Sequence, residues 1–245
     1  LMAGTVGMAV LWTLGAAAVL LAWPCVPGWL ARRRPGWLTP WAPPPTAILA
    51  SWRRPAPPAP WVLVAWTALV VLLAVVPWGG RLVAADLDAG LLWVLALATL
   101  AWLAVAGGGL GAAEAAGAIL ALVGAMAPVV MRAATLNLAD IAVAQQGGAG
   151  NWFLVREPFL LGAGIVYLLT IACAWSSTAA GSDGEVDPWR LALGWGWPLA
   201  ASLLFSVLYL GGWWAFVPTL DGWPWLNTAA KALVVQGVLL SLVRR

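Results

Sequence analysis

The sequence has very few charged residues and contains no histidine. Asp, Glu, Lys and Arg make up 9% of its 245 residues, against roughly 25% in a typical globular domain. A water-facing surface cannot be built from so little charge, which excludes an ordinary water-soluble protein. The lack of histidine removes bis-histidine haem ligation and the usual zinc and non-haem iron sites, and two distant cysteines cannot hold an iron–sulfur cluster.

The chain also lacks the groups that covalent catalysis needs. Its serines have no histidine to activate them, and Lys231 is the only amine inside a hydrophobic segment. The glycine-rich stretch at 107–111 is followed by no Lys-Ser or Lys-Thr pair and preceded by no strand pattern. It therefore predicts a turn rather than a phosphate-binding loop. We expect no self-contained active site.

Long hydrophobic runs fill the space that charge leaves. Hydrophobic residues make up 63% of the chain, with a mean hydropathy of +0.93, and five runs of about 25 residues or more contain no charged residue, enough for the roughly 20 apolar residues that cross a bilayer. Two weaker runs contain Glu114 and Lys231. The pattern predicts an all-α fold, a polytopic transmembrane helical bundle of about seven spans in one membrane domain, residues 1–245. The expected spans are residues 5–24, 61–78, 89–106, 112–131, 158–176, 191–211 and 226–243.

The arginines predict how the bundle is oriented. Alternating the seven spans places eight arginines, from Arg32 to Arg245, on one side and three on the other, which makes the arginine-rich side the inner one. The first span has no basic residues before it, so we expect it to be retained rather than cleaved. After it, the stretch TAILASW at 46–52 predicts a short amphipathic segment in the membrane interface, with a proline-stiffened linker as the alternative. Basic charge beside membrane spans does not indicate nucleic acid.

Several local expectations follow from residue types. Cys25 and Cys173 are expected to be small buried thiols, and Arg156 with Glu157 a solvated ion pair. Asn137 or Asp140 is expected to cap a short helix in the outer loop, and Glu114 to lie at a helix N-terminus, where the dipole favours an anion. Tryptophans near span ends predict an aromatic belt at the membrane interfaces: Trp23, Trp61, Trp78, Trp152, Trp189, Trp213 and Trp223.

Five stretches in order resemble the motifs of one family. They are VAADLDAGLLWVLALATLAWLAVAGGG, EAAGAILALVGAMAPVVM, LNLADIAVAQ, NWFLVREPFLL and LYLGGWW, preceded by RRPG at 33–36. Together they are similar to subunit 1 of respiratory complex I (NADH:quinone oxidoreductase), the H subunit of the bacterial enzyme, whose relatives include membrane subunits of energy-converting hydrogenases. The resemblance covers about residue 30 to the end of the chain.

The resemblance implies a function and a site. In this family the protein anchors the hydrophilic redox arm and helps form a quinone chamber from the first span, the interfacial segment and an acidic inner loop. It implies quinone as substrate, no directly bound cofactor, and flavin and iron–sulfur clusters in partner subunits. The candidate quinone-binding residues are Arg34, Gly36, Trp37, Trp52, Asp183 and Arg190. The candidate proton-pathway residues are Asp86, Glu114, Glu185 and Asp187.

The sequence departs from the family where carboxylates are expected. Trp175 stands at a Glu position of the inner loop, Thr178 at an Arg position, and Met126 where a carboxylate is expected just before Pro128. An apolar side chain cannot exchange a proton, so a relay through these positions is doubtful. We also expect the family's last span to be absent from this chain and to be supplied by another polypeptide.

The resemblance predicts a membrane subunit of proton-pumping complex I, in contact with the neighbouring complex I subunits, quinone and the lipid bilayer. The mitochondrial inner membrane is favoured, with the bacterial plasma membrane as the alternative. Three other functions stay open: a membrane component of a hydrogenase, a small transporter or channel suggested by Lys231, and a purely structural component of the complex.

Overall fold

The computed structural model describes residues 60–79, 87–106, 112–179, 188–216 and 222–243, and every regular element in these ranges is a helix. Six helices among them are 16 to 22 residues long. They are α4 (Pro60–Val75), α5 (Gly90–Ala106), α6 (Ala112–Ala133), α9 (Pro158–Ala179), α10 (Pro188–Tyr209) and α11 (Pro224–Val243). Three short elements lie between α6 and α9: α7 (Leu138–Val143), the 3-10 turn η1 (Ala149–Asn151) and α8 (Phe153–Arg156).

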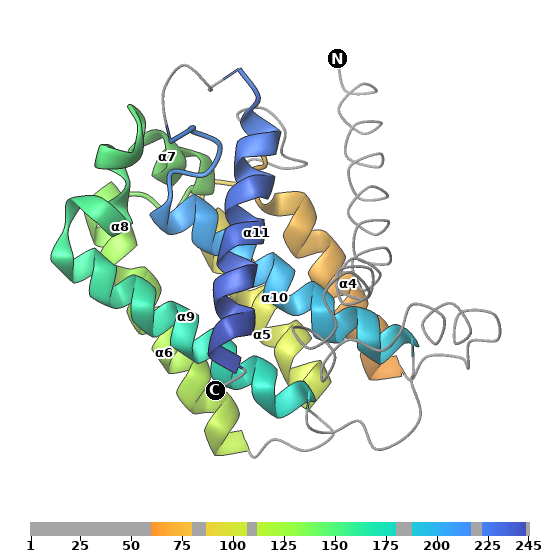
Figure 1. Cartoon of the computed structure of the whole chain (residues 1–245). Helices are drawn as coiled ribbons and strands as arrows, with labels where there is room; N and C mark the ends of the chain where they lie inside the picture. Colours follow the sequence, from red (N-terminus) through yellow and green to blue (C-terminus); the bar gives the residue numbers. More distant parts are fainter. Residues whose placement is uncertain (1–59, 80–86, 107–111, 180–187, 217–221, 244–245) are drawn as a thin grey trace.

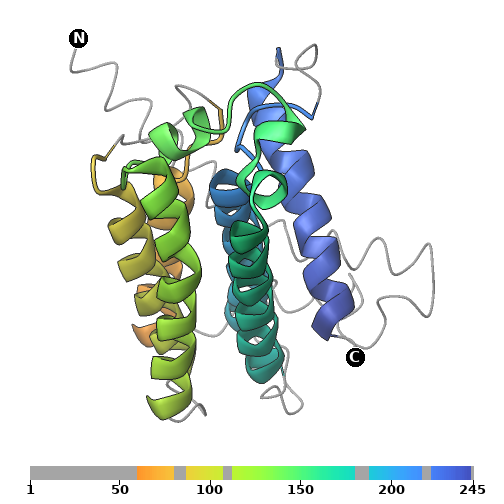
Figure 2. The ribbon, with the colours of Figure 1, turned by 90° about the vertical axis from the view of Figure 1, so that its left-hand side faces the viewer.

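The long helices lie side by side and run alternately up and down (Figure 1, Figure 2). The short elements gather at one end of this bundle. We call residues 134–157, which contain them, the outer cap, because the arginine pattern places this loop on the outer side. The opposite end, where α4 and α10 begin and α9 ends, is the inner end.

Prolines start four of the long helices. Pro60, Pro158, Pro188 and Pro224 are the first residues of α4, α9, α10 and α11. Proline suits this position because the first backbone N–H of a helix has no partner within it and the ring fixes a helical φ.

Helix α10 forms the core of the bundle. It packs against α4, α6, α9 and α11, and every residue from Trp195 to Tyr209 is buried. A helix that is apolar on all sides and buried on all sides is expected at the centre of a membrane bundle. The helices around it expose large apolar side chains instead, such as Leu120, Met131 and Phe159, at 71%, 82% and 74%. These faces are suited to lipid.

The described part of the chain confirms the helical class but not the number of spans. Three helical segments are long and apolar enough to cross a membrane: Ala116–Ala133, Pro158–Ser176 and Pro224–Val243. The apolar helices Pro60–Val75, Gly90–Ala101 and Leu193–Tyr209 are shorter. The expected first span at 5–24 and the interfacial segment at 46–52 lie outside the described residues.

Two of the shorter helices end earlier than the sequence predicted. α4 stops at Val75, three residues before the expected end, because Pro77 follows and has no N–H to continue the helix. α10 stops at Tyr209 because Gly211 and Gly212 adopt left-handed φ values of 71° and 53°. Sixteen helical residues span only about 24 Å, less than the roughly 30 Å of a bilayer core.

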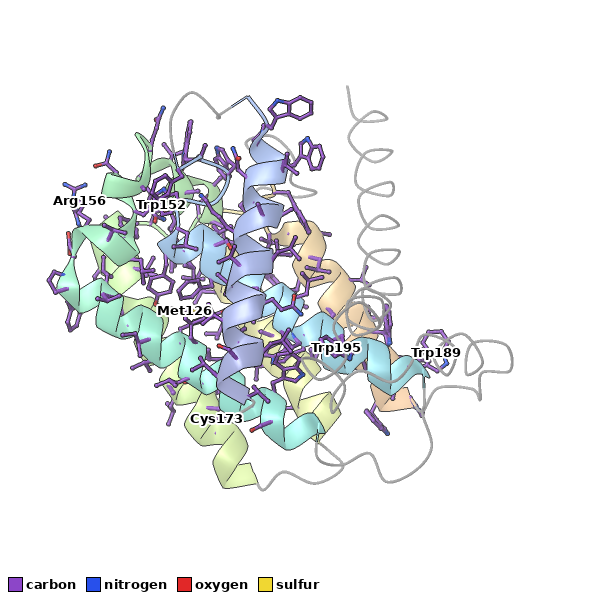
Figure 3. All side chains as sticks on the ribbon, viewed as in Figure 1. Met126, Trp152, Arg156, Cys173, Trp189 and Trp195 are labelled. Carbon is purple, nitrogen blue, oxygen red and sulfur yellow. The ribbon has the colours of Figure 1, made fainter. Side chains whose placement is uncertain are left out.

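The aromatic belt and the buried thiol are partly wrong as predictions. Trp152 and Trp213 are 7% and 6% exposed and belong to the interior, whereas Trp223 is 62% exposed, as a belt residue should be. Cys173 is exposed on the outside of α9 and not buried (Figure 3). Position near a span end does not reveal whether a side chain faces the bundle or the lipid, which caused both errors.

Candidate functional site

The predicted site residues lie largely outside the described residues. This holds for Arg34, Gly36, Trp37, Trp52 and Asp183 of the quinone-binding set and for Asp86, Glu185 and Asp187 of the proton-pathway set. The backbone of Arg190 lies in the first turn of α10 and that of Glu114 in the first turn of α6, as expected for a helix N-terminus. The described residues therefore form the frame around the predicted site.

At the inner end, tryptophans join α10 to its neighbours. Trp66 of α4 and Trp189 of α10 meet edge to face, with ring centroids 5.9 Å apart, and Nε1 of Trp66 donates to the Trp189 carbonyl at 3.3 Å. Trp175 of α9 and Trp195 of α10 meet edge to face at 5.4 Å. Figure 3 labels Trp189 and Trp195 toward the same end of α10, far from Trp152. We call these four residues the inner tryptophan cluster.

The inner tryptophan cluster gives the predicted chamber side an apolar frame. Trp175, which stands at a glutamate position of the resembling family, is 6% exposed, and Trp195 is 4% exposed. An edge-to-face aromatic pair contributes roughly 0.5–1.5 kcal/mol beyond its buried area. This position therefore stabilises the contact between α9 and α10 and cannot carry a proton.

Aromatic residues also fill the middle of the bundle. Tyr167, Phe205 and Tyr209 form a three-ring cluster between α9 and α10, with centroids 4.8 to 6.1 Å apart. The Tyr209 hydroxyl donates to the Ala125 carbonyl of α6 at 2.6 Å, and the Tyr167 hydroxyl donates to the Ala201 carbonyl at 3.0 Å. Both hydroxyls thus bind the main chain, and they connect α6, α9 and α10.

Met126 lies beside this aromatic cluster in α6. It is 4% exposed and follows Ala125, whose carbonyl accepts the Tyr209 hydroxyl. Pro128 lies two residues further along the same helix. The position where the family resemblance expects a carboxylate is therefore a packed apolar site.

At the outer end, Gln145 connects the outer cap to α10. Its side chain is completely buried. Nε2 lies 3.0 to 3.2 Å from the carbonyls of Ile141, Val207 and Leu208, and Oε1 accepts from the N–H groups of Phe153 and Gly211 at 3.1 and 3.0 Å. One amide thus binds α7, the start of α8 and the end of α10. The sequence analysis did not single out Gln145, although a glutamine directly after IAVA was a usable signal.

Lys231 binds the loop that follows α10. Its ammonium donates to the carbonyls of Leu210, Gly212 and Trp214, at 2.5, 2.9 and 2.5 Å. The same nitrogen lies 4.1 Å from the ring centroid of Trp152. The lysine inside the last predicted span therefore connects α11 to the end of α10 and to the outer cap.

The outer cap confirms one local expectation and corrects another. Asn137 caps α7, with its side-chain oxygen accepting from the N–H groups of Ala139 and Asp140 at 2.7 and 3.2 Å. The predicted pair of Arg156 and Glu157 is wrong, because Glu157 binds Arg132 at the end of α6, at 2.5 Å. Glu157 has an extended backbone between α8 and α9, so its side chain does not follow that of its neighbour. The pair is more than a third exposed on both sides and is worth little stability.

The buried central helix, the lipid-suited faces and the aromatic interior define a polytopic helical membrane protein. No model of a known protein family matches the chain. Two bacterial proteins do match it, the NADH-quinone oxidoreductase H subunit 2 from each of two strains of Cereibacter sphaeroides. Each is 34% identical over 226 residues, covering 81% of this chain and 67% of the relative. The chain belongs to the family of NADH-quinone oxidoreductase H subunits, as the motifs predicted.

The family fixes the kind of assembly and corrects the compartment. Members named in this way are subunits of an enzyme complex, and the apolar helices make this chain an integral membrane protein. The relatives are bacterial, so the preference for a mitochondrial membrane has no support, whereas the bacterial plasma membrane does. The mitochondrial preference came from the lost charges, which do not indicate an organelle.

Proposed function

We propose that this chain helps form the quinone-binding chamber of a bacterial NADH:quinone oxidoreductase and anchors its hydrophilic redox arm. The observation that carries the proposal is the 34% identity to bacterial H subunits over 81% of the chain. Electrons would reach quinone from flavin and iron–sulfur clusters held by partner subunits. The chain itself would supply shape, apolar walls and a docking rim.

The inner tryptophan cluster supports a chamber at the inner end. Ligand sites are mostly apolar walls with a few polar groups that fix orientation. The buried rings of Trp66, Trp175 and Trp195 provide rigid apolar support there. The polar groups would come from Arg34, Asp183 and Arg190, with Gly36, Trp37 and Trp52 beside the quinone.

The inner acidic residues are suited to docking a partner. Asp183, Glu185 and Asp187 fall within five positions just before α10, on the side predicted to face the redox arm. Charges at the rim of an interface steer association and fix its register. Asp86, Glu114, Glu185 and Asp187 remain the candidates for a proton pathway, and the last two have both roles open.

Neutralising the inner acids separates these two roles. The triple variant Asp183→Asn, Glu185→Gln, Asp187→Asn is expected to lower the amount of redox arm that co-purifies with the membrane part several-fold. NADH:quinone activity per membrane should fall in proportion, because the docking rim has lost its charge. The number of protons moved per electron in the remaining complexes should stay unchanged.

The matched control for this experiment is Asp140→Asn, an exposed carboxylate of the outer cap. It should leave arm retention and activity unchanged. Full arm retention with a lower proton-to-electron ratio would assign Glu185 and Asp187 to the proton pathway and contradict their docking role.

Met126 offers a second test, because the proposal gives it no part in proton transfer. Met126→Leu conserves volume in a packed core and should cost less than about 1.5 kcal/mol. We expect quinone reduction and proton translocation in membrane vesicles to match those of the parent. A variant that assembles and reduces quinone but no longer translocates protons would show that this apolar position does matter for coupling.

The transporter alternative depended on Lys231 as an ionisable group in the last span. Its ammonium donates to three carbonyls at the end of α10, which gives the lysine a structural role. A flux of substrate through liposomes that contain the isolated chain would revive this alternative. Activity that persists with a quinone-site inhibitor would instead favour the role in a hydrogenase.

A further inference from the structure

Three carbonyl groups converge on one point in the loop after α10. The carbonyl oxygens of Leu210, Gly212 and Trp214 all lie within 2.9 Å of the Lys231 nitrogen. We call these three groups the carbonyl cradle. They belong to alternate residues, and the left-handed turn at Gly211 and Gly212 gives the chain the bend on which this arrangement depends. A side chain at Gly211 would collide with Trp152, so the bend depends on glycine there.

The surroundings of the cradle favour a positive charge. The cradle follows the C-terminus of α10, where the aligned peptide dipoles place roughly half a negative charge. The ring of Trp152 lies 4.1 Å from the ammonium and presents its electron-rich face. Trp152 is held in place by an edge-to-face contact with Phe216, at 5.7 Å between centroids.

Gln145 leaves the cradle for a cation. The carbonyls of Val207 and Leu208, which precede the cradle, accept from the neutral amide of Gln145. The Ser206 carbonyl accepts from the N–H groups of Leu210 and Gly212. The carbonyls that remain beyond the helix end bind the ammonium. The end of α10 is thus divided between neutral donors and one charged donor.

We propose that the carbonyl cradle is a binding site for a primary ammonium ion, which Lys231 occupies from α11. An ammonium group has three N–H donors around one nitrogen, which matches three convergent carbonyls, whereas the planar guanidinium of arginine spreads its donors over a fork. The cradle therefore recognises the R–NH3+ group itself. A chain with a shortened side chain at 231 accepts a free alkylammonium ion in its place. This inference does not depend on the quinone role.

Chemical rescue tests the site. Lys231→Ala in the full chain, purified in detergent, should lower the thermal unfolding midpoint by about 5 to 10 °C, because several charge-assisted hydrogen bonds are lost. Adding n-propylammonium or n-butylammonium at constant ionic strength should restore at least half of that shift. Potassium and tetramethylammonium, which have no N–H donor, should restore none.

The matched control is Val234→Ala on the same helix, a shortened side chain that is 67% exposed away from the cradle. Its unfolding midpoint should not respond to any of these ions. Equal rescue of Lys231→Ala by tetramethylammonium would reduce the effect to ionic strength and overturn the proposal. So would a Lys231→Met variant as stable as the parent.

A measurement on the unmodified protein avoids variants that fail to fold. Lys231 is the only lysine of the chain, so 15N-lysine labelling gives a single side-chain signal. The cradle predicts a slowly exchanging NH3+ correlation near neutral pH, with its protons shifted upfield by the Trp152 ring, and Trp152→Leu should remove the ring shift. A rapidly exchanging signal at the position of free lysine would overturn the proposal.

Discussion

Gly211→Ala is expected to destabilise the protein by about 2–5 kcal/mol, from backbone strain and overpacking together. Gly211 has φ +71°, where other residues are strained, and an added Cβ would lie 2.8 Å from both Cδ1 and Nε1 of Trp152. Trp152 cannot easily move, because it is 7% exposed and contacts Phe216 and Lys231. Moving the backbone instead would displace the carbonyl cradle.

The measurement is unfolding of the full chain in detergent, by denaturant or heat, with Gly237→Ala as the control. Gly237 lies in α11, and an added Cβ would meet nothing within 4 Å. Alanine there should be neutral or stabilise by about 0.5–1 kcal/mol, because it favours the helix. Similar behaviour of the two variants would mean that the bend after α10 does not depend on glycine.

Gln145→Leu is the second substitution with a large expected effect, about 3–5 kcal/mol, because two buried N–H groups lose their acceptor and each unsatisfied group costs about 1–3 kcal/mol. The groups are the backbone N–H of Phe153 and of Gly211. The carbonyls of Val207 and Leu208 lose their donor at the same time. Leucine has a similar volume, so the loss reflects hydrogen bonding rather than a cavity.

Gln146→Leu is the matched control, since the neighbouring glutamine is exposed. It should change stability by less than about 0.5 kcal/mol. The free energy of unfolding measures both variants, and protease sensitivity of the outer cap shows whether the damage is local. If Gln145→Leu is as stable as Gln146→Leu, the buried amide does not hold the outer cap to α10.

The sequence predicted the apolar helices well because their signal is local. The expected spans 112–131, 158–176 and 226–243 agree closely with α6, α9 and α11. An uncharged run of this length has few alternatives in a membrane. Where the prediction ran too long, at α4 and α10, the cause was a Pro or a Gly pair whose effect depends on backbone conformation.

The contacts that organise the outer end could not be read from the sequence. Gln145 contacts residues more than 60 positions away, and Lys231 binds carbonyls 17 to 21 positions before it. Residue types predict that a buried amide or ammonium needs partners, but not which backbone groups supply them. The same limit explains why Glu157 was assigned to Arg156 and not to Arg132. The quinone-site residues came from the family motifs alone.

The most direct test of the account is to purify the tagged chain from its native bacterial membranes in mild detergent and analyse what comes with it. The account predicts co-purification with flavin- and iron–sulfur-containing subunits, together with NADH:quinone reductase activity that quinone-site inhibitors block. Recovery of the chain alone, or with partners that carry no electron-transfer groups, would contradict it.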